Sequence, residues 1–336
     1  MAGGLGAPDG QSLKGGIGCG ADIAGLLGEA DRMFAELEGA VNHETSVRLG
    51  HRAISLVHWL IHLIGLAREE GWEVAEIRAL LPDAWRIHGD STYIRHIQEW
   101  PRGYAGDFLA INMVVDRDER ADSGTLGGVI GRYALGITIA EQHREKLRIQ
   151  AGMIREACRR VRGARIVSVA CGSARDMEQV RDEIRGSGAR VTLVDFDQGA
   201  LDDALGRLGA LRDQVTPVLS DVRRLPKLMR ALTEAGGRAD LVYAGGLFDY
   251  LPEGIVRRVL RPLADELLAE GGTLMFTNIA PGNPWKAWME TMGNWRLIER
   301  TEAEMDALLA HTGLGEQRLE RDPSGLAWVA RARRGA

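Results

Sequence analysis

Residues 166–178 read Ile-Val-Ser-Val-Ala-Cys-Gly-Ser-Ala-Arg-Asp-Met-Glu, and this stretch decides the fold. Its first half is an apolar run that predicts a buried strand, and it leads into a tight turn at Gly172 and then into a helix. A second apolar run, residues 191–195, ends in the carboxylate of Asp195, 23 residues after that glycine. A strand, a glycine turn, a helix and a second strand that ends in an acid are typical of one half of an α/β nucleotide-binding fold.

The number of glycines in the turn indicates which nucleotide binds. A dinucleotide needs three glycines, because its pyrophosphate approaches the backbone and the helix packs closely on the strand. Here Ser173, Ala174 and Arg175 follow Gly172, and no further glycine comes at the required spacing. The carboxylate of Asp195 can accept hydrogen bonds from both ribose hydroxyls. We therefore expect a ligand that has a ribose and no pyrophosphate, and S-adenosylmethionine (SAM) is the common one.

Strands and helices alternate from Arg165 onward, which predicts a Rossmann-like α/β sheet with helices on both faces. We expect parallel strands near residues 166–170, 191–195, 216–219, 240–244 and 273–278, with helices between them that include 199–211, 223–235 and 254–268. Two further segments, 316–320 and 326–332, are separated by the turn sequence Asp-Pro-Ser-Gly and predict a terminal antiparallel hairpin. A parallel sheet with such a hairpin resembles the class I SAM-dependent methyltransferases.

The N-terminal part of the chain has a different pattern. Residues 1–20 hold eight glycines and predict a flexible tail. Residues 21–82 and 126–161 carry apolar side chains at helical spacing, whereas residues 83–125 are less regular. We therefore expect an all-α cap domain over 21–145 that binds the substrate, and a SAM-binding domain over 146–336.

The composition argues against several functional classes. A net charge of −5 does not favour a nucleic-acid partner. Three cysteines give neither a disulfide framework nor a zinc spacing, which favours the cytoplasm. The apolar stretch 53–67 is short for a membrane span and predicts a buried helix. It contains His58 and His62 at a spacing that could bind a metal, but the apolar surroundings favour packed core histidines, and we expect no metal.

Ligands of doubly wound sheets bind at the carboxyl ends of the strands, so the strand ends supply the candidate cofactor residues. The third strand ends at Asp221 and Val222, which can contact an adenine edge, and two glycines after the fourth strand permit close approach to the methionine part. Asp195 and Asp221 have an alternative role as helix N-caps. The candidate cofactor-binding residues are Ala170, Gly172, Ser173, Asp195, Phe196, Asp221, Val222, Gly245, Gly246 and Phe248.

Five short strings carry a resemblance to a known family. They are residues 101–107 (Pro-Arg-Gly-Tyr-Ala-Gly-Asp), 169–175 (Val-Ala-Cys-Gly-Ser-Ala-Arg), 243–251 (Tyr-Ala-Gly-Gly-Leu-Phe-Asp-Tyr-Leu), 278–284 (Asn-Ile-Ala-Pro-Gly-Asn-Pro) and 295–301 (Trp-Arg-Leu-Ile-Glu-Arg-Thr). Residues 100–335 thereby resemble the methyltransferase family associated with biosynthesis of extracellular factor, 3-hydroxypalmitic acid methyl ester. The resemblance implies a class I fold, SAM as the cofactor, a helical N-terminal cap and, more weakly, a carboxylate substrate. Ala170 and Ser173 depart from the Gly and Pro that the family often has there.

A carboxylate acceptor is already ionised at neutral pH and needs no general base. It needs an arginine to orient it, and Arg102, Arg144 and Arg300 are candidates. Aromatic side chains can face the sulfonium of SAM by cation–π attraction. The candidate catalytic residues are Arg102, Tyr104, Asp107 and Tyr250, and the candidate substrate-binding residues are Tyr133, Arg144, Asn278 and Trp285.

We expect a SAM-dependent methyltransferase that acts on a small molecule in specialised metabolism, with neither nucleic acid nor membrane as a partner and a homodimer as a possible assembly. The same pocket could instead let the amine of SAM attack its own Cγ, which yields azetidine-2-carboxylic acid and methylthioadenosine. A third alternative is a non-catalytic protein with the same fold, which would serve as a binding or scaffold module. Candidate ligand groups at all four strand ends argue against that alternative.

Overall fold

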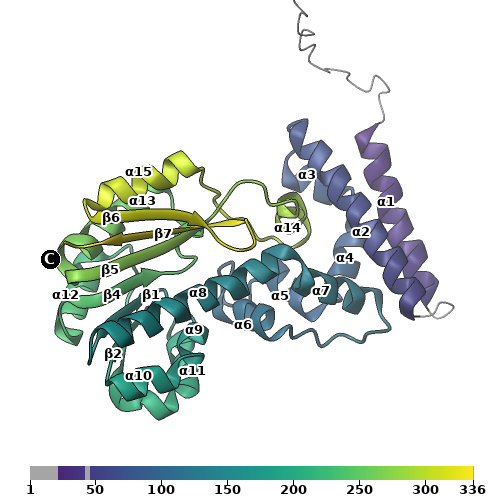
Figure 1. Ribbon diagram of the computed structural model, residues 1–336. Helices are drawn as coiled ribbons and strands as arrows, with labels where there is room; N and C mark the ends of the chain where they lie inside the picture. The colour runs from purple at the N-terminus through teal and green to yellow at the C-terminus, as the bar shows by residue number, and fades with distance from the viewer. Residues whose placement is uncertain (1–21, 42–45, 336) are drawn as a thin grey trace, which may run out of the picture.

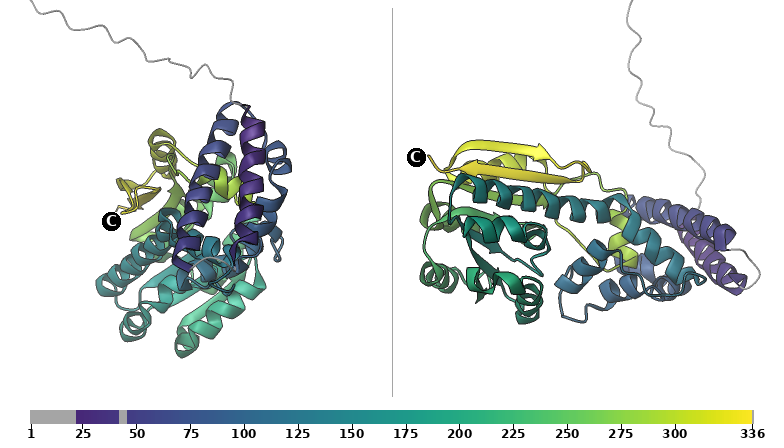
Figure 2. Two further views of the ribbon diagram at one scale, coloured as in Figure 1. Left: turned by 90° about the vertical axis from the view of Figure 1, so that its right-hand side faces the viewer. Right: turned by 60° about the horizontal axis from the view of Figure 1, so that its bottom comes forward.

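The computed structural model describes residues 22–41 and 46–335, and the predicted tail at 1–20 lies outside them. A helical part lies at one end of the molecule and a sheet at the other, and the long helix α8 runs along both (Figures 1 and 2). The helical part and α8 consist of α1 (Ile23–Gly39), α2 (Ser46–Glu69), α3 (Val74–Ala79), α4 (Pro82–His88), α5 (Thr92–Glu99), α6 (Phe108–Asp116), α7 (Leu126–Gly136) and α8 (Thr138–Arg160).

The sheet has seven strands in the order β3-β2-β1-β4-β5-β7-β6. The strands are β1 (Arg165–Val169), β2 (Arg190–Asp195), β3 (Val215–Leu219), β4 (Ala239–Ala244), β5 (Leu268–Ile279), β6 (Gly315–Arg321) and β7 (Ala327–Arg333). The first five are parallel, and β7 pairs antiparallel with both β5 and β6. The predicted parallel sheet and terminal hairpin are therefore confirmed.

Helices pack on both faces of the sheet, as the alternation predicts. They are α9 (Arg175–Glu178), α10 (Arg181–Ser187), α11 (Gln198–Arg207), α12 (Leu225–Ala235), α13 (Glu253–Pro262) and α15 (Glu302–Thr312), with short 3-10 segments at Gly209–Gln214 and Phe248–Tyr250 and a π segment at Leu263–Leu267. The remaining helix of this half, α14 (Lys286–Met292), packs in the helical part. Two separate apolar clusters fill the two faces. The parallel strands therefore have both faces covered, which explains why they read as continuous apolar runs.

The segment 83–125 is more ordered than its sequence suggests, because it contains α4, α5 and α6. Pro82, which we read as the end of a helix, is instead the first residue of α4, where its missing N–H costs nothing. The side chains of Ser91 and Asp107 cap α5 and α6 by accepting N–H bonds from the first turns. These helices have seven to nine residues, so their apolar pattern is too short to detect by periodicity.

Helix α2 is longer than we expected. Residues Val47–Glu69, with a mean hydropathy of 1.2, form the one helix among the described residues that is long and apolar enough to cross a membrane. The helix is two-sided, because Leu56, Leu60 and Leu63 are buried whereas His58 and His62 are exposed. It contacts α1, α7 and α14 through its apolar side. We interpret α2 as a core helix of the helical part, and His58 and His62 are surface residues and not the core residues that we expected.

The helical part and the sheet share side chains. Trp288, Trp295 and Leu326, which come from the C-terminal half, join the apolar core of the helical part. Helix α14, which follows β5, contacts α2 and α3. Helix α8 is continuous from Thr138 to Arg160 and so runs through the domain boundary that we expected between residues 145 and 146. The ends of the strands thus face a wall built by the N-terminal helices.

Candidate active site

A cavity of about 570 Å³ lies at the carboxyl ends of β1 to β4. Its floor is formed by residues that follow these strands, and its walls by α8 and by residues 102–106. Parallel sheets bind ligands at this edge, and the volume is in the usual range for a small-molecule site. The predicted residues that line it are Arg102, Tyr104, Ala170, Gly172, Ser173, Asp195, Phe196, Asp221, Val222, Gly245, Gly246 and Tyr250.

The turn after β1 has an unusual backbone. Ala170, Gly172 and Ala174 have φ angles of 56°, 52° and 51°. This left-handed region suits glycine, and an alanine there is strained by about 1–2 kcal/mol. Strain of this kind is concentrated at ligand sites. The turn therefore has the geometry of a binding loop although it has only one glycine.

Asp195 is fixed beneath this turn. Its Oδ2 accepts the N–H of Gly172 at 2.9 Å, and its Oδ1 accepts the N–H of Asp197 at 3.0 Å. Burial raises the pKa of Asp195, while these two backbone N–H groups lower it. A carboxylate has about four acceptor positions, so two remain for a ligand. The side chain that caps α11 is Asp197 and not Asp195, which removes the alternative role of Asp195 as an N-cap.

Asp221 also does not cap a helix. It accepts hydrogen bonds from the N–H and the guanidinium of Arg223, and the residue before α12 is Arg224. Two nearby hydroxyls, on Ser173 and Ser220, are buried and have no hydrogen-bond partner among the described residues. Both serines line the cavity. Buried polar atoms that the protein leaves unpaired at a strand edge fit a ligand rich in hydroxyl and amine groups.

The 100–107 loop lies over the cavity. The guanidinium of Arg102 binds both carboxylate oxygens of Asp197, and the hydroxyl of Tyr104 donates to the same carboxylate at 2.8 Å. The ring of Tyr104 also packs on Phe196, with 4.8 Å between the centroids. The polar ends of Arg102 and Tyr104 are therefore used to attach the loop to the end of β2. This arrangement gives them a structural role and does not support the catalytic role that we expected.

Asp107 lies outside the cavity lining. Its Oδ1 accepts the N–H groups of Leu109 and Ala110, and its Oδ2 lies 2.8 Å from His96 Nε2. It is 1% exposed. Asp107 is thus the N-cap of α6, and a catalytic role is not supported.

Other predicted residues are also held elsewhere. Phe248 is buried in the core of the sheet domain against Phe276. Arg144 donates to the carbonyls of Val114 and Leu135 and to Glu141, so its guanidinium ties helices together. Arg144 is not among the residues that line the cavity in the described chain, so a role in orienting a substrate is not supported.

Asn278 and Arg300 bind each other, and Arg300 also donates to the carbonyls of Phe248 and Leu251. Tyr133 and Trp285 form a second pair away from the cavity. The Trp285 Nε1–H donates to the Tyr133 hydroxyl, which contacts His58. None of these four is among the residues that line the cavity in the described chain. The Tyr133–Trp285 pair connects the two parts of the molecule, whereas Asn278 and Arg300 bond within the C-terminal half.

Five further residues line the cavity that were not predicted from the sequence. His143, Lys146 and Gln150 reach the cavity from α8, and Asp176 and Tyr243 reach it from the sheet side. The Tyr243 hydroxyl donates to Asp176 at 2.5 Å, and burial raises the pKa of Asp176 to about 6. The polar side chains at positions 143, 146 and 150 recur at helical spacing, and this pattern could have indicated one polar helix face turned toward the site.

Comparison with known proteins agrees with this geometry. The family described as "Putative methyltransferase" matches residues 118–334. The chain belongs to this methyltransferase family. No protein with a curated description matches the chain.

Two solved structures share the fold of this family member. One, from Bordetella parapertussis and described as a possible exported protein, is 21% identical, with a TM-score of 0.56, and the match covers 88% of this chain and 98% of that chain. The other, a putative methyltransferase from Thermobifida fusca, is 16% identical, with a TM-score of 0.52 and a cover of 67% and 94%. At these identities the likeness shows the fold alone.

The methyltransferase family and the cavity together identify SAM as the cofactor, in agreement with the glycine count. Asp195 offers acceptors for a ribose, and Asp221 and Val222 lie at the next strand end for an adenine. Gly245 and Gly246 fill a different role from the one we expected. The space in front of them is taken by the side chains of Gln150 and Lys146 and not left open.

Proposed function

We propose that the protein transfers the methyl group of SAM to a small molecule that carries a carboxylate, in specialised metabolism in the cytoplasm. The observation that carries this proposal is the cavity at the ends of β1 to β4, with Asp195 fixed beneath a strained turn. The resemblance of residues 100–335 to a family associated with a methyl ester supports the carboxylate.

The residues of the chain bind, orient and enclose the reactants. When bound, SAM supplies a methyl group whose bond to sulfur breaks as an acceptor oxygen forms its bond to carbon, and a carboxylate releases no proton. Asp195 and the turn at Gly172 would hold the nucleoside. The 100–107 loop excludes water from the same space, because Arg102 and Tyr104 fasten it to Asp197.

Tyr250 lies in the cavity wall and remains a candidate for contact with the acceptor. Its hydroxyl accepts the Nε1–H of Trp295 at 2.9 Å. Burial raises the pKa of Tyr250 above its usual value, so the hydroxyl keeps its proton and can donate it to a hydrogen bond.

Mass spectrometry of the protein as purified, followed by product analysis, tests the proposal. We expect an adenosyl species to copurify, and S-adenosylhomocysteine (SAH) to form from SAM when an extract of carboxylic acids is supplied. Methylthioadenosine formed from SAM alone would indicate cyclisation instead. Absence of any SAM or SAH binding by calorimetry would overturn both functions and favour a binding module for another ligand.

A further inference from the structure

Helix α8 presents a polar stripe to the cavity. His143, Lys146 and Gln150 are spaced i, i+3 and i+7, which places them on one face of the helix. All three line the cavity, and they are 3%, 7% and 4% exposed. Side chains of these types are rarely buried together unless they have partners or a ligand. This face of α8 is therefore a candidate binding surface.

Lys146 differs from the other cations of the cavity wall. The lining arginines each pair with a carboxylate: Arg102 with Asp197, Arg175 with Asp116 and Arg223 with Asp221. Lys146 Nζ instead lies 3.2 Å from Nδ1 of a histidine, His143. Burial lowers the pKa of Lys146, and the charges of Asp249 and Asp322 raise it. The ammonium group is thus buried in the cavity wall with a hydrogen bond to an imidazole.

The backbone is shaped to admit this ammonium group. A Cβ on Gly246 would lie 2.5 Å from Lys146 Nζ, so any other residue at position 246 would push the ammonium group out of this place. The nearby carboxyl of Asp249 is partly used by the backbone, because its Oδ1 accepts the N–H of Ile279 at 2.7 Å. Burial raises the pKa of Asp249 to about 6, and the charges of Lys146 and Arg300 lower it. Asp249 and Asp322 act on Lys146 only at a distance, because no ion pair joins its ammonium group to a carboxylate among the described residues. The ammonium group is therefore available to an anion at this end of the cavity.

His143 holds Lys146 in place. Its ring stacks on Trp295, with 5.4 Å between the centroids and 13° between the planes. An ammonium group has only hydrogens to offer, so Nδ1 accepts the bond and the ring proton lies on Nε2. Burial, followed by the charges of Lys146 and Arg144, lowers the pKa of His143 well below its usual value, which keeps the ring neutral.

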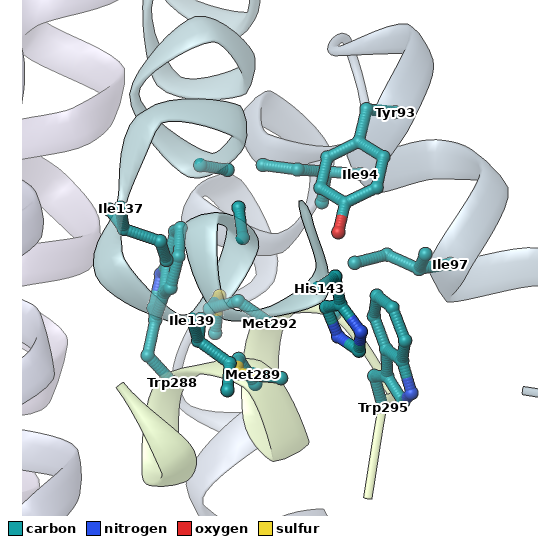
Figure 3. A pocket seen from close by; sticks show the side chains of 13 residues that line it. Tyr93, Ile94, Ile97, Ile137, Ile139, His143, Trp288, Met289, Met292 and Trp295 are labelled. Atoms are coloured by element: carbon teal, nitrogen blue, oxygen red, sulfur yellow. The ribbon is translucent and has the colours of Figure 1, made fainter. Parts of the chain in front are cut away.

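The other ring nitrogen of His143, Nε2, is buried and contributes no hydrogen bond within the described part of the structure. His143 also lines a second cavity of about 30 Å³, where the side chains of Ile94 and Ile97 have no acceptor, the sulfur of Met289 accepts from Asn283, and the Tyr93 hydroxyl points inward (Figure 3). A buried N–H without a partner destabilises a fold, and groups of this kind are tolerated where they serve function.

We propose that Lys146 binds an anionic oxygen of the acceptor and that His143 is the positioning residue that holds the ammonium group toward it. The inference rests on the proposed methyl transfer, because it assumes that an acceptor enters this cavity. It assigns the acceptor to molecules with a carboxylate or phenolate oxygen. An amine would bring a second positive charge beside Lys146, where the low dielectric makes repulsion strong.

The test uses the full-length protein saturated with SAH and measures binding of benzoate and benzylamine by NMR or calorimetry. We expect the wild-type complex to bind benzoate and not benzylamine. Lys146→Met weakens benzoate binding by about tenfold or more, because a charge-assisted hydrogen bond is lost. His143→Leu weakens it, and His143→Asn, which keeps an acceptor near the Nδ1 position, restores it. Lys227→Met, on an exposed lysine, leaves it unchanged.

The readouts separate this inference from the proposed function. If the wild-type protein does not bind SAH, methyl transfer fails before the acceptor site is tested. If SAH binds normally but benzylamine binds as well as benzoate, or neither binds, or Lys146→Met binds benzoate like wild type, the assignment of Lys146 is overturned. The comparison of acid with amine on the wild-type complex decides the question even where a variant does not fold.

Discussion

At the scale of single residues, the same side-chain type has opposite uses according to what surrounds it. Asp195, Asp197 and Asp107 lie in or near the cavity, and all three carboxylates accept backbone N–H bonds. Only Asp195 both lines the cavity and has acceptor positions left over. Asp197 receives Arg102 and Tyr104, which lowers its pKa, and Asp107 is buried as a cap. Position relative to the strand ends therefore decides which acid contacts the cofactor.

Replacement of Asp195 tests the cofactor site. We expect Asp195→Ala to weaken SAM binding by at least about tenfold, because two hydrogen bonds from ribose hydroxyls to a charged acceptor are lost, each worth about 1.5–3 kcal/mol. Calorimetry with SAM measures the dissociation constant. Asp202→Ala, on the exposed side of α11, serves as the matched control. An unchanged dissociation constant in a folded Asp195→Ala protein contradicts the site.

The buried carboxyl of Asp176 should make the stability of the protein depend on pH. Its pKa in the folded protein is about 6, above the ordinary value of 3.8, because the carboxyl is buried. The stability that this group contributes is fully present below pH 3.8 and is lost as the pH rises through 6. Asp176→Asn removes this titration. As the pH rises from about 4 to about 7.5, the free energy of unfolding of the variant should therefore increase relative to that of wild type by roughly 2–4 kcal/mol.

Thermal unfolding of wild-type and Asp176→Asn protein at the two pH values measures the gain. The exposed Asp182→Asn is the control, since its side chain is 92% exposed. The same difference between Asp176→Asn and wild type at both pH values would show that Asp176 is not protonated in the folded state.

At the scale of elements, the strand ends could be predicted from the sequence and the helix faces could not. Asp195 is the last residue of β2, and Asp221 comes two residues after β3. An acid at this place marks the binding edge, because the carboxyl ends of parallel strands share one side of the sheet. The stretch that contains His143, Arg144 and Lys146 reads as a solvated helix face, since charged residues are common there. All three are buried, and only the packing of α8 between the sheet and the helical part makes them so.

The sequence predicted that the 100–107 loop lies at the site, but it did not predict what the side chains of the loop do there. A glycine-rich loop with an arginine and a tyrosine indicates function, and the 100–107 loop does lie on the cavity. That Arg102 and Tyr104 turn toward Asp197 depends on a contact across 95 and 93 residues of sequence. No local pattern reports such a contact.

The attachment of this loop predicts its effect on ligand release. Arg102→Met removes the bonds to Asp197 but leaves the cap of α11 intact, so SAH should dissociate about tenfold faster, as expected for a lost charge-assisted hydrogen bond at a partly exposed site. Stopped-flow displacement of SAH measures the rate. Arg120→Met, which breaks an exposed pair with Asp118, is the control. Equal release rates would show that the loop does not limit exit.

Asp107 gives a second prediction at this scale. Because Asp107 is the N-cap of α6, the substitution Asp107→Ala should lower the free energy of unfolding by about 1–2 kcal/mol. It should leave the affinity for SAH unchanged. Thr125→Ala, at the N-cap of α7, should cost a similar amount. Thermal unfolding with SAH calorimetry measures both. A loss of turnover in Asp107→Ala without a loss of stability would restore the catalytic role that we first expected.

At the scale of the whole molecule, the helical part and the sheet were predicted as two domains, but the structure has them share a core. Trp288, Met292 and Trp295 belong to the half of the chain that forms the sheet, and they pack among the N-terminal helices. They are 4%, 1% and 2% exposed. His143 and Tyr250 then contact Trp295, so the cavity wall depends on this shared packing. The helical part is thus a structural component of the site and not a separate lid.

This shared core predicts that the sheet half does not function alone. A fragment of residues 138–336 keeps α8 and every strand but exposes the three side chains of the shared core as one apolar patch, which promotes aggregation. We expect the fragment to be insoluble or to bind SAH at least about tenfold more weakly than the full chain, since Trp295 no longer fixes His143 and Tyr250. Sedimentation and calorimetry measure the two outcomes. A soluble monomeric fragment that binds SAH as tightly as the full chain would show that the cavity forms without the N-terminal helices, and that only the acceptor end depends on them.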